Sequence, residues 1–293
     1  MKRAGCKPFD PLVVRKRLSG RPGSKYIPPG WTVTPNHLGG VPCEVAARPG
    51  VRSDLAVLYL HGGGYFFGSP LTHRPLVLAM ADVADAPGFV LDYRLAPEHP
   101  FPAALDDALA AYRALSAKRS VLIAGDSAGG GLALALASAV REAGLPPPVA
   151  IVAFSPWTDL ANTGAAVVEN AQRCAMFTAP ALHQAAGLYL AGADPADPRA
   201  SPLHADLSGL PPLLLFAGSD EMMRDDTTRL AERARAAGVD VDMHLEPGVP
   251  HVWPMFARYL PEGRAALRVV RAFIQRVAPW HPRTRGAILR RFM

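Results

Sequence analysis

Short, uninterrupted apolar runs recur along this chain, and longer segments with helical spacing separate them. Such runs are typical of strands buried on both faces, because a half-buried strand alternates apolar and polar residues. Strands and helices in alternation predict a mostly parallel sheet with helices on both sides. The expected strands are residues 56–60, 89–91, 121–124, 150–154 and 213–216, and the expected helices are residues 72–84, 102–117, 129–143, 224–237 and 263–278.

The two ends of the chain depart from this alternation. Residues 1–30 are polar, basic and punctuated by Pro and Gly, which predicts a short, loosely held arm with room for one helix. Residues 31–45 read as a β-hairpin whose turn is Leu38-Gly39-Gly40. A last strand is expected over residues 239–245.

Almost sixty residues separate the strand that ends near Phe154 from the next one, which begins near Leu213. A plain helical crossover needs about half of that length. The excess, about residues 158–206, is therefore interpreted as an insertion. An insertion at this point is expected to lie over the carboxyl edge of the sheet, where open α/β folds bind their ligands.

Composition limits the classes of function. With 293 residues, of which 49% are hydrophobic, the chain is long enough for one large domain, residues 1–293. Its three cysteines fit neither a metal site nor a disulfide framework, which favours a reducing, cytoplasmic location. Cys6 lacks the preceding apolar segment of a lipoprotein signal. The Ala/Leu-rich stretch at 132–140 is too short to span a bilayer, so no stable membrane insertion is expected.

The net charge of +6 comes from the ends of the chain. Residues 1–26 hold eight Lys/Arg and one Asp, and residues 281–293 hold four Arg and no acid, so the remainder is net acidic. Solvated termini explain this distribution better than a basic groove does, although weak attraction to anionic surfaces stays open. No basic motif with interleaved aromatic residues is present, so nucleic acid is not an expected partner.

Ser127 stands in Gly125-Asp126-Ser127-Ala128-Gly129, between an apolar strand and a stretch of good helix formers. A G-x-S-x-G motif in a strand–turn–helix context exposes the serine hydroxyl above the edge of the sheet. The motif alone is weak evidence, since a glycine-rich turn that joins a strand to a helix reads the same way.

A serine hydroxyl needs a neighbouring base, and the base needs an acid that fixes its tautomer. His251 is the best of nine histidines, because it follows the expected last strand on the loop Gly248-Val249-Pro250. The acid is expected after the strand at 213–216, where Asp220 is preferred and Glu221 is the competitor. The order Ser, Asp, His is that of α/β hydrolases.

The segment His61-Gly62-Gly63-Gly64-Tyr65 directly follows the first buried strand. Acyl transfer places negative charge on a carbonyl oxygen, which preorganised backbone N–H groups stabilise. We assign Gly63, Gly64 and Ala128 as donors to this oxyanion. A phosphate loop is the rival interpretation, but the chain has no G-x-x-x-x-G-K-[ST] sequence.

Taken together, these motifs resemble the hormone-sensitive-lipase-like esterases and lipases, also called bacterial family IV, of the α/β-hydrolase fold. The resemblance covers about residues 30–278. It rests on HGGGY at 61–65, DYRLAPEHPFPAALDD at 92–107, GDSAGG at 125–130, SPWTDL at 155–160, GSDE at 218–221 and PHVW at 250–253.

The resemblance implies a helical cap, built from about residues 1–30 and the insertion at 158–206, over the acyl and alcohol pockets. It also supports the Ser–Asp–His triad and the three oxyanion donors. The activity that it implies requires no cofactor and no metal. Two departures concern the cap: the N-terminal arm is short, and Cys174-Ala175 stands where relatives often carry Asp-Pro. Asp92, Arg94 and Glu98 are expected to hold a supporting polar network.

We therefore predict a serine carboxylesterase that acts on small esters with short to medium acyl chains through an acyl-enzyme. An amidase or lactonase on the same triad is one alternative, and a hydrolase-like protein that binds a small ligand without turnover is another. The oligomeric state is left open, with a homodimer as one outcome. The candidate pocket linings are Tyr65, Phe66, Trp157, Tyr189 and Trp253, each of which fits core packing equally well.

Overall fold

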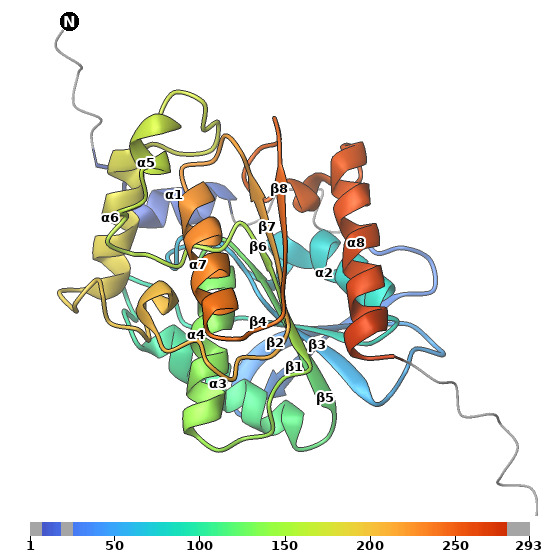
Figure 1. The fold of residues 1–293 in the computed structure, drawn as a ribbon. Helices are drawn as coiled ribbons and strands as arrows, with labels where there is room; N and C mark the ends of the chain where they lie inside the picture. Colours follow the sequence, from blue (N-terminus) through green and yellow to red (C-terminus); the bar gives the residue numbers. More distant parts are fainter. Residues whose placement is uncertain (1–7, 19–25, 280–293) are drawn as a thin grey trace, which may run out of the picture.

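The five apolar runs form the strands β3 to β7 of one eight-stranded sheet in the computed structural model, which describes residues 8–18 and 26–279 (Figure 1). The order across the sheet is β1-β2-β4-β3-β5-β6-β7-β8, and β2 alone among these strands runs against its neighbours. The predicted α/β-hydrolase fold, with a mostly parallel central sheet, is confirmed. The strands are β1 (Thr32–Leu38), β2 (Val41–Ala47), β3 (Leu55–Leu60), β4 (Gly88–Leu91), β5 (Ser120–Asp126), β6 (Ala150–Phe154), β7 (Leu213–Gly218) and β8 (Val241–Glu246).

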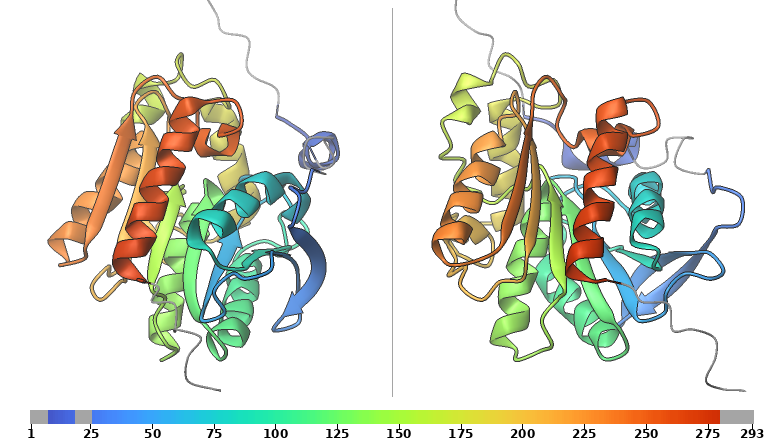
Figure 2. Two further views of the ribbon diagram at one scale, coloured as in Figure 1. Left: turned by 90° about the vertical axis from the view of Figure 1, so that its right-hand side faces the viewer. Right: turned by 45° about the vertical axis from the view of Figure 1, so that its right-hand side comes forward.

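Helices cover both faces of the sheet (Figure 2). Helices α2 and α8 pack side by side on one face, and α3, α4 and α7 cover the other. The described helices are α1 (Pro11–Leu18), α2 (Pro70–Ala84), α3 (Ala103–Ser116), α4 (Ala128–Glu142), α5 (Ala166–Glu169), α6 (Ala179–Leu190), α7 (Arg224–Ala236) and α8 (Pro261–Val277), with 3₁₀ turns η2 (Pro202–His204) and η3 (Trp253–Phe256).

Strand β3 shows why the apolar runs are continuous. Successive side chains of a strand point to opposite faces. Ala56 and Leu58 accordingly enter the core under α3 and α4, while Val57 and Tyr59 enter the core under α2 and α8. All six residues of β3 are fully buried. Because truncating a buried Leu costs about 2–5 kcal/mol, Leu58→Ala alone would remove much of the stability of a typical domain.

The predicted hairpin is confirmed by the pairing of β1 with β2, in which Leu38 lies opposite Val41. Gly39 and Gly40 form the turn with φ values of 58° and 84°. Two successive positive φ angles are what a tight two-residue hairpin turn requires, and glycine adopts them without steric cost.

The insertion between β6 and β7 contains α5, α6 and η2 (Figure 1). Helix α6 starts at an N-cap, Thr178, whose side chain accepts from the N–H of Ala181. The arm helix α1 lies close to α6, since Phe9 and Gln184 exchange two hydrogen bonds. The insertion and the arm thus adjoin each other, as a joint cap requires; their role as a cap stays a prediction.

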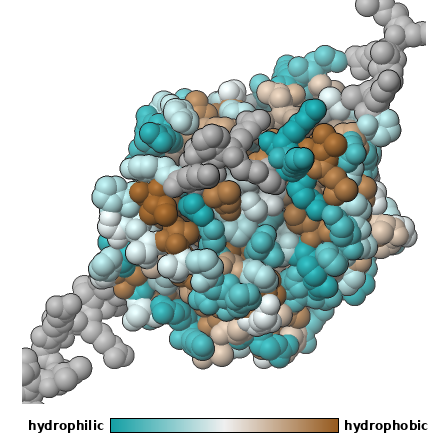
Figure 3. Space-filling model, turned by 180° about the vertical axis from the view of Figure 1, so that it is seen from behind, coloured by the Kyte–Doolittle hydropathy of each residue, from teal (hydrophilic) through white to brown (hydrophobic). Residues whose placement is uncertain are grey.

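Within residues 8–18 and 26–279, no helix combines the length and apolarity needed to traverse a bilayer. On the visible part of the face seen from behind, apolar groups are separated by hydrophilic residues (Figure 3). Cys6 lies outside the described residues, as do most of the basic residues of both termini.

Candidate active site

Ser127 lies at the sharp turn between β5 and α4, as predicted from the G-x-S-x-G motif. Its backbone has φ 52° and ψ −123°, a region that residues with a Cβ rarely adopt. The turn is held on both sides, because the Ser127 N–H donates to Phe154 O at 2.9 Å and its carbonyl accepts from Gly131 at 3.1 Å. The residue is 8% exposed and so is buried, whereas the motif predicts an exposed hydroxyl.

The flanking glycines are required by close packing of the backbone. A Cβ on Gly125 would collide with the carbonyl of Gly129, and a Cβ on Gly129 would collide with the carbonyls of Leu60 and His61. Helix α4 therefore begins directly against the end of β3. Its first N–H, that of Ala128, has no intrahelical acceptor and adds to the positive end of the helix dipole.

His251 follows β8 and is held by a buried carboxylate. Its Nδ1 lies 2.6 Å from Glu221 Oε2, with His251 5% exposed and Glu221 1% exposed. The other ring nitrogen, Nε2, is buried and has no hydrogen-bond partner among the described residues. Within residues 8–18 and 26–279, Nε2 therefore makes no hydrogen bond to the hydroxyl of Ser127.

The structure corrects the expected acid. Asp220 was preferred from the sequence, but its side chain is 39% exposed and lies 3.6 Å from Arg173 and 3.2 Å from the hydroxyl of Ser219. Glu221, the competitor, contacts His251 instead. The turn after β7 directs these two consecutive side chains to different places, and the longer one reaches the imidazole.

Two polar side chains fix Glu221 in turn. Ser155 donates its hydroxyl to Glu221 Oε1 at 2.7 Å and accepts the N–H of Val252 at 3.1 Å, so it joins the acid to the loop that carries the histidine. Asn170, in the insertion, donates to the carbonyls of Ser219 and Glu221. The Ser155 bond holds the carboxylate in one orientation toward the imidazole, and the Asn170 bonds hold the backbone of the turn that carries Glu221.

The glycine loop after β3 brings two further groups to this edge of the sheet. Gly63 and Gly64 have φ values of 123° and 57°, which a Cβ would strain. Their N–H groups donate to no protein acceptor within the described residues. The loop is closed on itself, since the carbonyl of Gly63 accepts from the N–H groups of Phe66 and Phe67.

A buried carboxylate that the sequence analysis did not single out ties this loop to the serine turn. Asp126 accepts from the Tyr59 hydroxyl at 2.7 Å and the Gly62 N–H at 3.1 Å, and it lies 3.3 Å from His73 Nε2. Burial by itself favours a higher pKa for Asp126, but the charge of His73 and the hydrogen bonds from His73 and Tyr59 outweigh it and lower the pKa. Its position directly before Ser127 was the signal available in the sequence.

His61 is a neutral member of the same network. Burial, followed by the nearby His73, lowers the pKa of His61 to about 3. Its ring stacks on Tyr93 with centroids 4.2 Å apart, and the Tyr93 hydroxyl donates to the His61 carbonyl at 2.6 Å. The residue thus packs and orients the start of the glycine loop.

The aromatic candidates fall into two groups. The ring of Tyr65 stacks on that of Tyr189 in α6, with centroids 3.7 Å apart, and its centroid lies 6.3 Å from that of Trp157. These three residues form a buried cluster between the glycine loop and the insertion. Trp253 is 1% exposed and packs edge-to-face on Phe216, in the core under α2 and α8. The prediction that Trp253 lines the pocket is corrected, because its ring belongs to the opposite core.

Beside His251 lies a hollow of about 260 Å³, lined by residues of the insertion and of the acid and histidine loops. Phe177 of the insertion packs edge-to-face on the imidazole at 5.1 Å. Phe66, the remaining candidate, packs on Phe9 of the arm, with ring centroids 4.9 Å apart.

Of the expected polar supports, Arg94 pairs with Asp107 and Glu98 pairs with Arg15. Arg15 belongs to the arm that the sequence predicts to be loosely held.

The chain is similar to known proteins in both sequence and structure. The α/β-hydrolase fold family matches residues 57–255. An esterase of the bacterial hormone-sensitive-lipase family superposes with a TM-score of 0.87 at 41% identity, over 94% of both chains. The chain belongs to this family.

Relatives of known sequence agree with that assignment. An acetyl-hydrolase of Streptomyces hygroscopicus is 45% identical over 258 residues, which is 86% of this chain and 85% of the relative. An esterase of Acinetobacter venetianus is 35% identical over 84% of this chain and 82% of the relative. A structure of the esterase EstE5 soaked with p-nitrophenyl butyrate has a TM-score of 0.87 at 38% identity, covering 93% of both chains. This hormone-sensitive-lipase-family chain is accordingly a serine carboxylesterase.

Proposed function

We propose that this carboxylesterase hydrolyses small esters with short to medium acyl chains, using Ser127, His251 and Glu221. The buried contact between His251 Nδ1 and Glu221 Oε2 carries the proposal. A carboxylate at Nδ1 keeps the proton on that nitrogen and leaves Nε2 free to act as the base. Nε2 has no competing partner among the described residues.

The reaction proceeds in two halves. Ser127 Oγ attacks the ester carbonyl while Nε2 of His251 takes the hydroxyl proton. The tetrahedral oxyanion accepts hydrogen bonds from the N–H groups of Gly63, Gly64 and Ala128, each typically contributing about 2.7–4 kcal/mol as judged by removal. The C–O bond then breaks, and the alcohol leaves with the proton from His251.

Water completes the cycle by the same route. His251 accepts a proton from water, the hydroxide adds to the acyl carbonyl, and Ser127 leaves with the proton returned by the imidazole. Glu221 remains ionised and stabilises the imidazolium that forms in both halves. The hydrogen bond from Ser127 Oγ to His251 Nε2 is expected to form in the substrate complex, because catalytic hydrogen bonds are often long in unliganded enzymes.

The preference for short acyl groups has independent support. The buried stack of Tyr65 on Tyr189 leaves little depth under α6. One relative is called an acetyl-hydrolase, and the relative EstE5 was soaked with a four-carbon acyl ester.

The test is a series of p-nitrophenyl esters from acetate to dodecanoate, measured with the wild type and with Ser127→Ala. We expect the highest kcat/KM at short to medium chains and no turnover by the variant. Equal rates for both proteins would overturn the serine mechanism, and a maximum at the longest chain would overturn the chain-length assignment. A nitroanilide and a lactone in the same assay test the amidase and lactonase alternatives.

A further inference from the structure

A single side chain joins the arm helix α1 to the loop that carries the proposed oxyanion donors. Arg15 Nε donates to the carbonyl of Phe66 at 2.8 Å, and Arg15 Nη2 donates to the carbonyl of Ala96 at 2.6 Å. The guanidinium therefore binds the glycine loop and the loop after β4 at once. These two loops also contact each other directly, since the N–H of Ala96 donates to Tyr65 O at 2.9 Å.

The orientation of the guanidinium is itself fixed. Glu98 accepts from Nη1 at 2.7 Å and from Nη2 at 2.8 Å, a bidentate pair that holds the plane of the fork. All three guanidinium nitrogens of Arg15 thus have acceptors on the loops. A lysine in this position offers a compact ammonium and cannot reproduce the fork.

The arm has a second, separate attachment. The backbone of Phe9 exchanges two hydrogen bonds with the side chain of Gln184 on α6, at 3.0 and 2.7 Å. The hydrogen bonds of this attachment dock the arm on the insertion, and the ring of Phe9 also stacks on that of Phe66, with centroids 4.9 Å apart. A Gln184 variant removes only the hydrogen bonds to the insertion, whereas an Arg15 variant removes the hydrogen bonds to the loop carbonyls.

The carbonyl held by Arg15 lies close to the proposed donors. Phe66 is two residues beyond Gly64, and its ring packs so near that a Cβ on Gly64 would lie 3.0 Å from Phe66 Cε1. The N–H of Phe66 donates to Gly63 O at 3.1 Å, which closes the turn that presents both glycines. Any shift of Phe66 is therefore transmitted to the N–H groups of Gly63 and Gly64.

We propose that Arg15 is a positioning residue for the oxyanion hole, acting through its hydrogen bonds to the carbonyls of Phe66 and Ala96. The inference rests on the proposed function in one respect, namely that Gly63 and Gly64 are the donors. Misplacement of catalytic groups by about 1 Å can cost on the order of a hundredfold in rate. Losing Arg15 is thus expected to lower kcat, whereas a residue that merely docks the arm over the substrate affects mainly KM.

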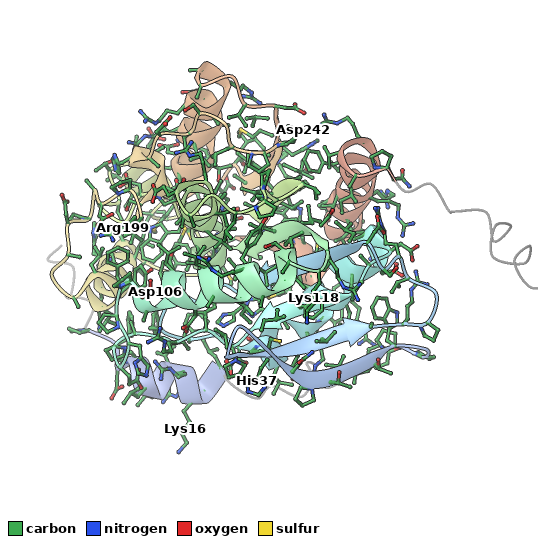
Figure 4. All side chains as sticks on the ribbon, turned by 90° about the horizontal axis from the view of Figure 1, so that it is seen from below. Lys16, His37, Asp106, Lys118, Arg199 and Asp242 are labelled. Carbon is green, nitrogen blue, oxygen red and sulfur yellow. The ribbon has the colours of Figure 1, made fainter. Side chains whose placement is uncertain are left out.

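The experiment compares Arg15→Gln with Gln184→Ala and with Lys16→Gln, using p-nitrophenyl butyrate. Lys16 is the matched control, because it follows Arg15 on α1, is exposed and points away from the body of the molecule (Figure 4). We expect Arg15→Gln to lower kcat by about tenfold or more with a smaller change in KM. Gln184→Ala should change mainly KM, and Lys16→Gln should match the wild type.

A trifluoromethyl ketone supplies the second readout. Its adduct with the serine places an oxyanion in the hole, so its affinity reports on the N–H groups. We expect Arg15→Gln to weaken the binding of this inhibitor by the same factor by which it lowers kcat. Arg15→Lys keeps the charge opposite Glu98, so its kcat and inhibitor affinity should lie between those of the wild type and Arg15→Gln. If Arg15→Gln melts out at the assay temperature, the comparison is made with Arg15→Lys alone.

Two results would overturn the proposal. One is an Arg15→Gln enzyme with unchanged kcat and inhibitor affinity, and the other is a change in KM alone that matches Gln184→Ala. Ser127→Ala in the same assay keeps the failures apart. If that variant is inactive while Arg15→Gln behaves like the wild type, the positioning role fails and the serine mechanism stands.

Discussion

Glu221 Oε2 lies 2.6 Å from His251 Nδ1, and the pair is almost completely buried. The neighbouring Asp220 is 39% exposed at its side chain and lies against Arg173 instead. Two consecutive acidic residues therefore occupy different environments at the end of β7. The contrast gives an internal control for the role of the acid.

Glu221→Gln is expected to lower kcat by about 10³–10⁴-fold, since an amide at Nδ1 favours the wrong imidazole tautomer and carries no charge. Asp220→Asn should leave kcat close to that of the wild type, because the Asp220 side chain lies against Arg173 and Ser219 and makes no hydrogen bond to His251. Steady-state kinetics on p-nitrophenyl acetate at pH 7.5 check both. Comparable losses in the two variants would contradict the assignment of Glu221.

The Asp126 network should be visible in stability. Tyr59→Phe removes the hydroxyl that donates to the buried carboxylate at 2.7 Å, and hydrogen bonds to charged groups contribute about 1.5–3 kcal/mol. We expect the free energy of unfolding in urea to fall by about this amount. Tyr259→Phe, at a residue that is 75% exposed, is the control and should change the free energy of unfolding by less than about 0.5 kcal/mol. Equal stability of the two variants would show that the Tyr59 contact contributes nothing.

Substitution by Ala is expected to have opposite effects on stability at Gly129 and at Gly187. Gly129→Ala forces a Cβ into the carbonyls of Leu60 and His61, so a loss above about 4 kcal/mol is expected. Gly187, inside α6, has nothing within 4 Å of its would-be Cβ, and Ala there should stabilise by about 0.5–1 kcal/mol. Thermal melting of both variants provides the measurement. A Gly129→Ala protein as stable as the wild type would refute the close approach of α4 to β3.

The pH dependence of stability should carry a contribution from Asp226. This buried carboxyl accepts the N–H groups of Thr158 and Asp159 at 2.7 and 2.8 Å, where the insertion begins. Burial, the largest influence, raises the pKa of Asp226 to about 8 from 3.8. Between about pH 4 and pH 8 the folded protein keeps a proton that the unfolded chain has lost, so this residue makes the protein less stable as pH rises.

Asp226→Asn removes that titration. We expect the Tm of the variant to rise relative to the wild type as the pH goes from 5 to 9, as measured by scanning calorimetry. Asp225→Asn is the control: hydrogen bonds from Arg224 and Ala166 outweigh burial and lower the pKa of Asp225, so no trend is expected in that range. A constant difference between Asp226→Asn and the wild type would contradict the raised pKa.

Much of the fold followed from local pattern. Continuous apolar runs identified the buried strands because parallel sheets covered on both faces exclude polar side chains, as β3 illustrates. The glycines around Ser127 identified the sharp turn because a Cβ at either position collides with backbone. The position of His251 after the last strand was enough to bring it to the carboxyl edge.

Other features depend on contacts that no local pattern encodes. Asp220 and Glu221 satisfy the same sequence rule, and only their contacts in the folded protein, with Arg173 and with His251 respectively, distinguish them. Trp253 fits a pocket or a core equally well by composition, and only its packing against Phe216 places it in the core under α2 and α8. Arg15 looked like part of a solvated basic run, yet its acceptors lie 51 to 83 residues further along the chain.

The most direct test of the central claim is the mass of the intact enzyme after reaction with a fluorophosphonate, followed by peptide mapping. Ser127, activated by His251 and Glu221, should gain one phosphonyl group, and Ser127→Ala should gain none while remaining folded. A wild-type enzyme that hydrolyses esters but stays unlabelled at Ser127, or an adduct that persists at another residue in active Ser127→Ala, would contradict it.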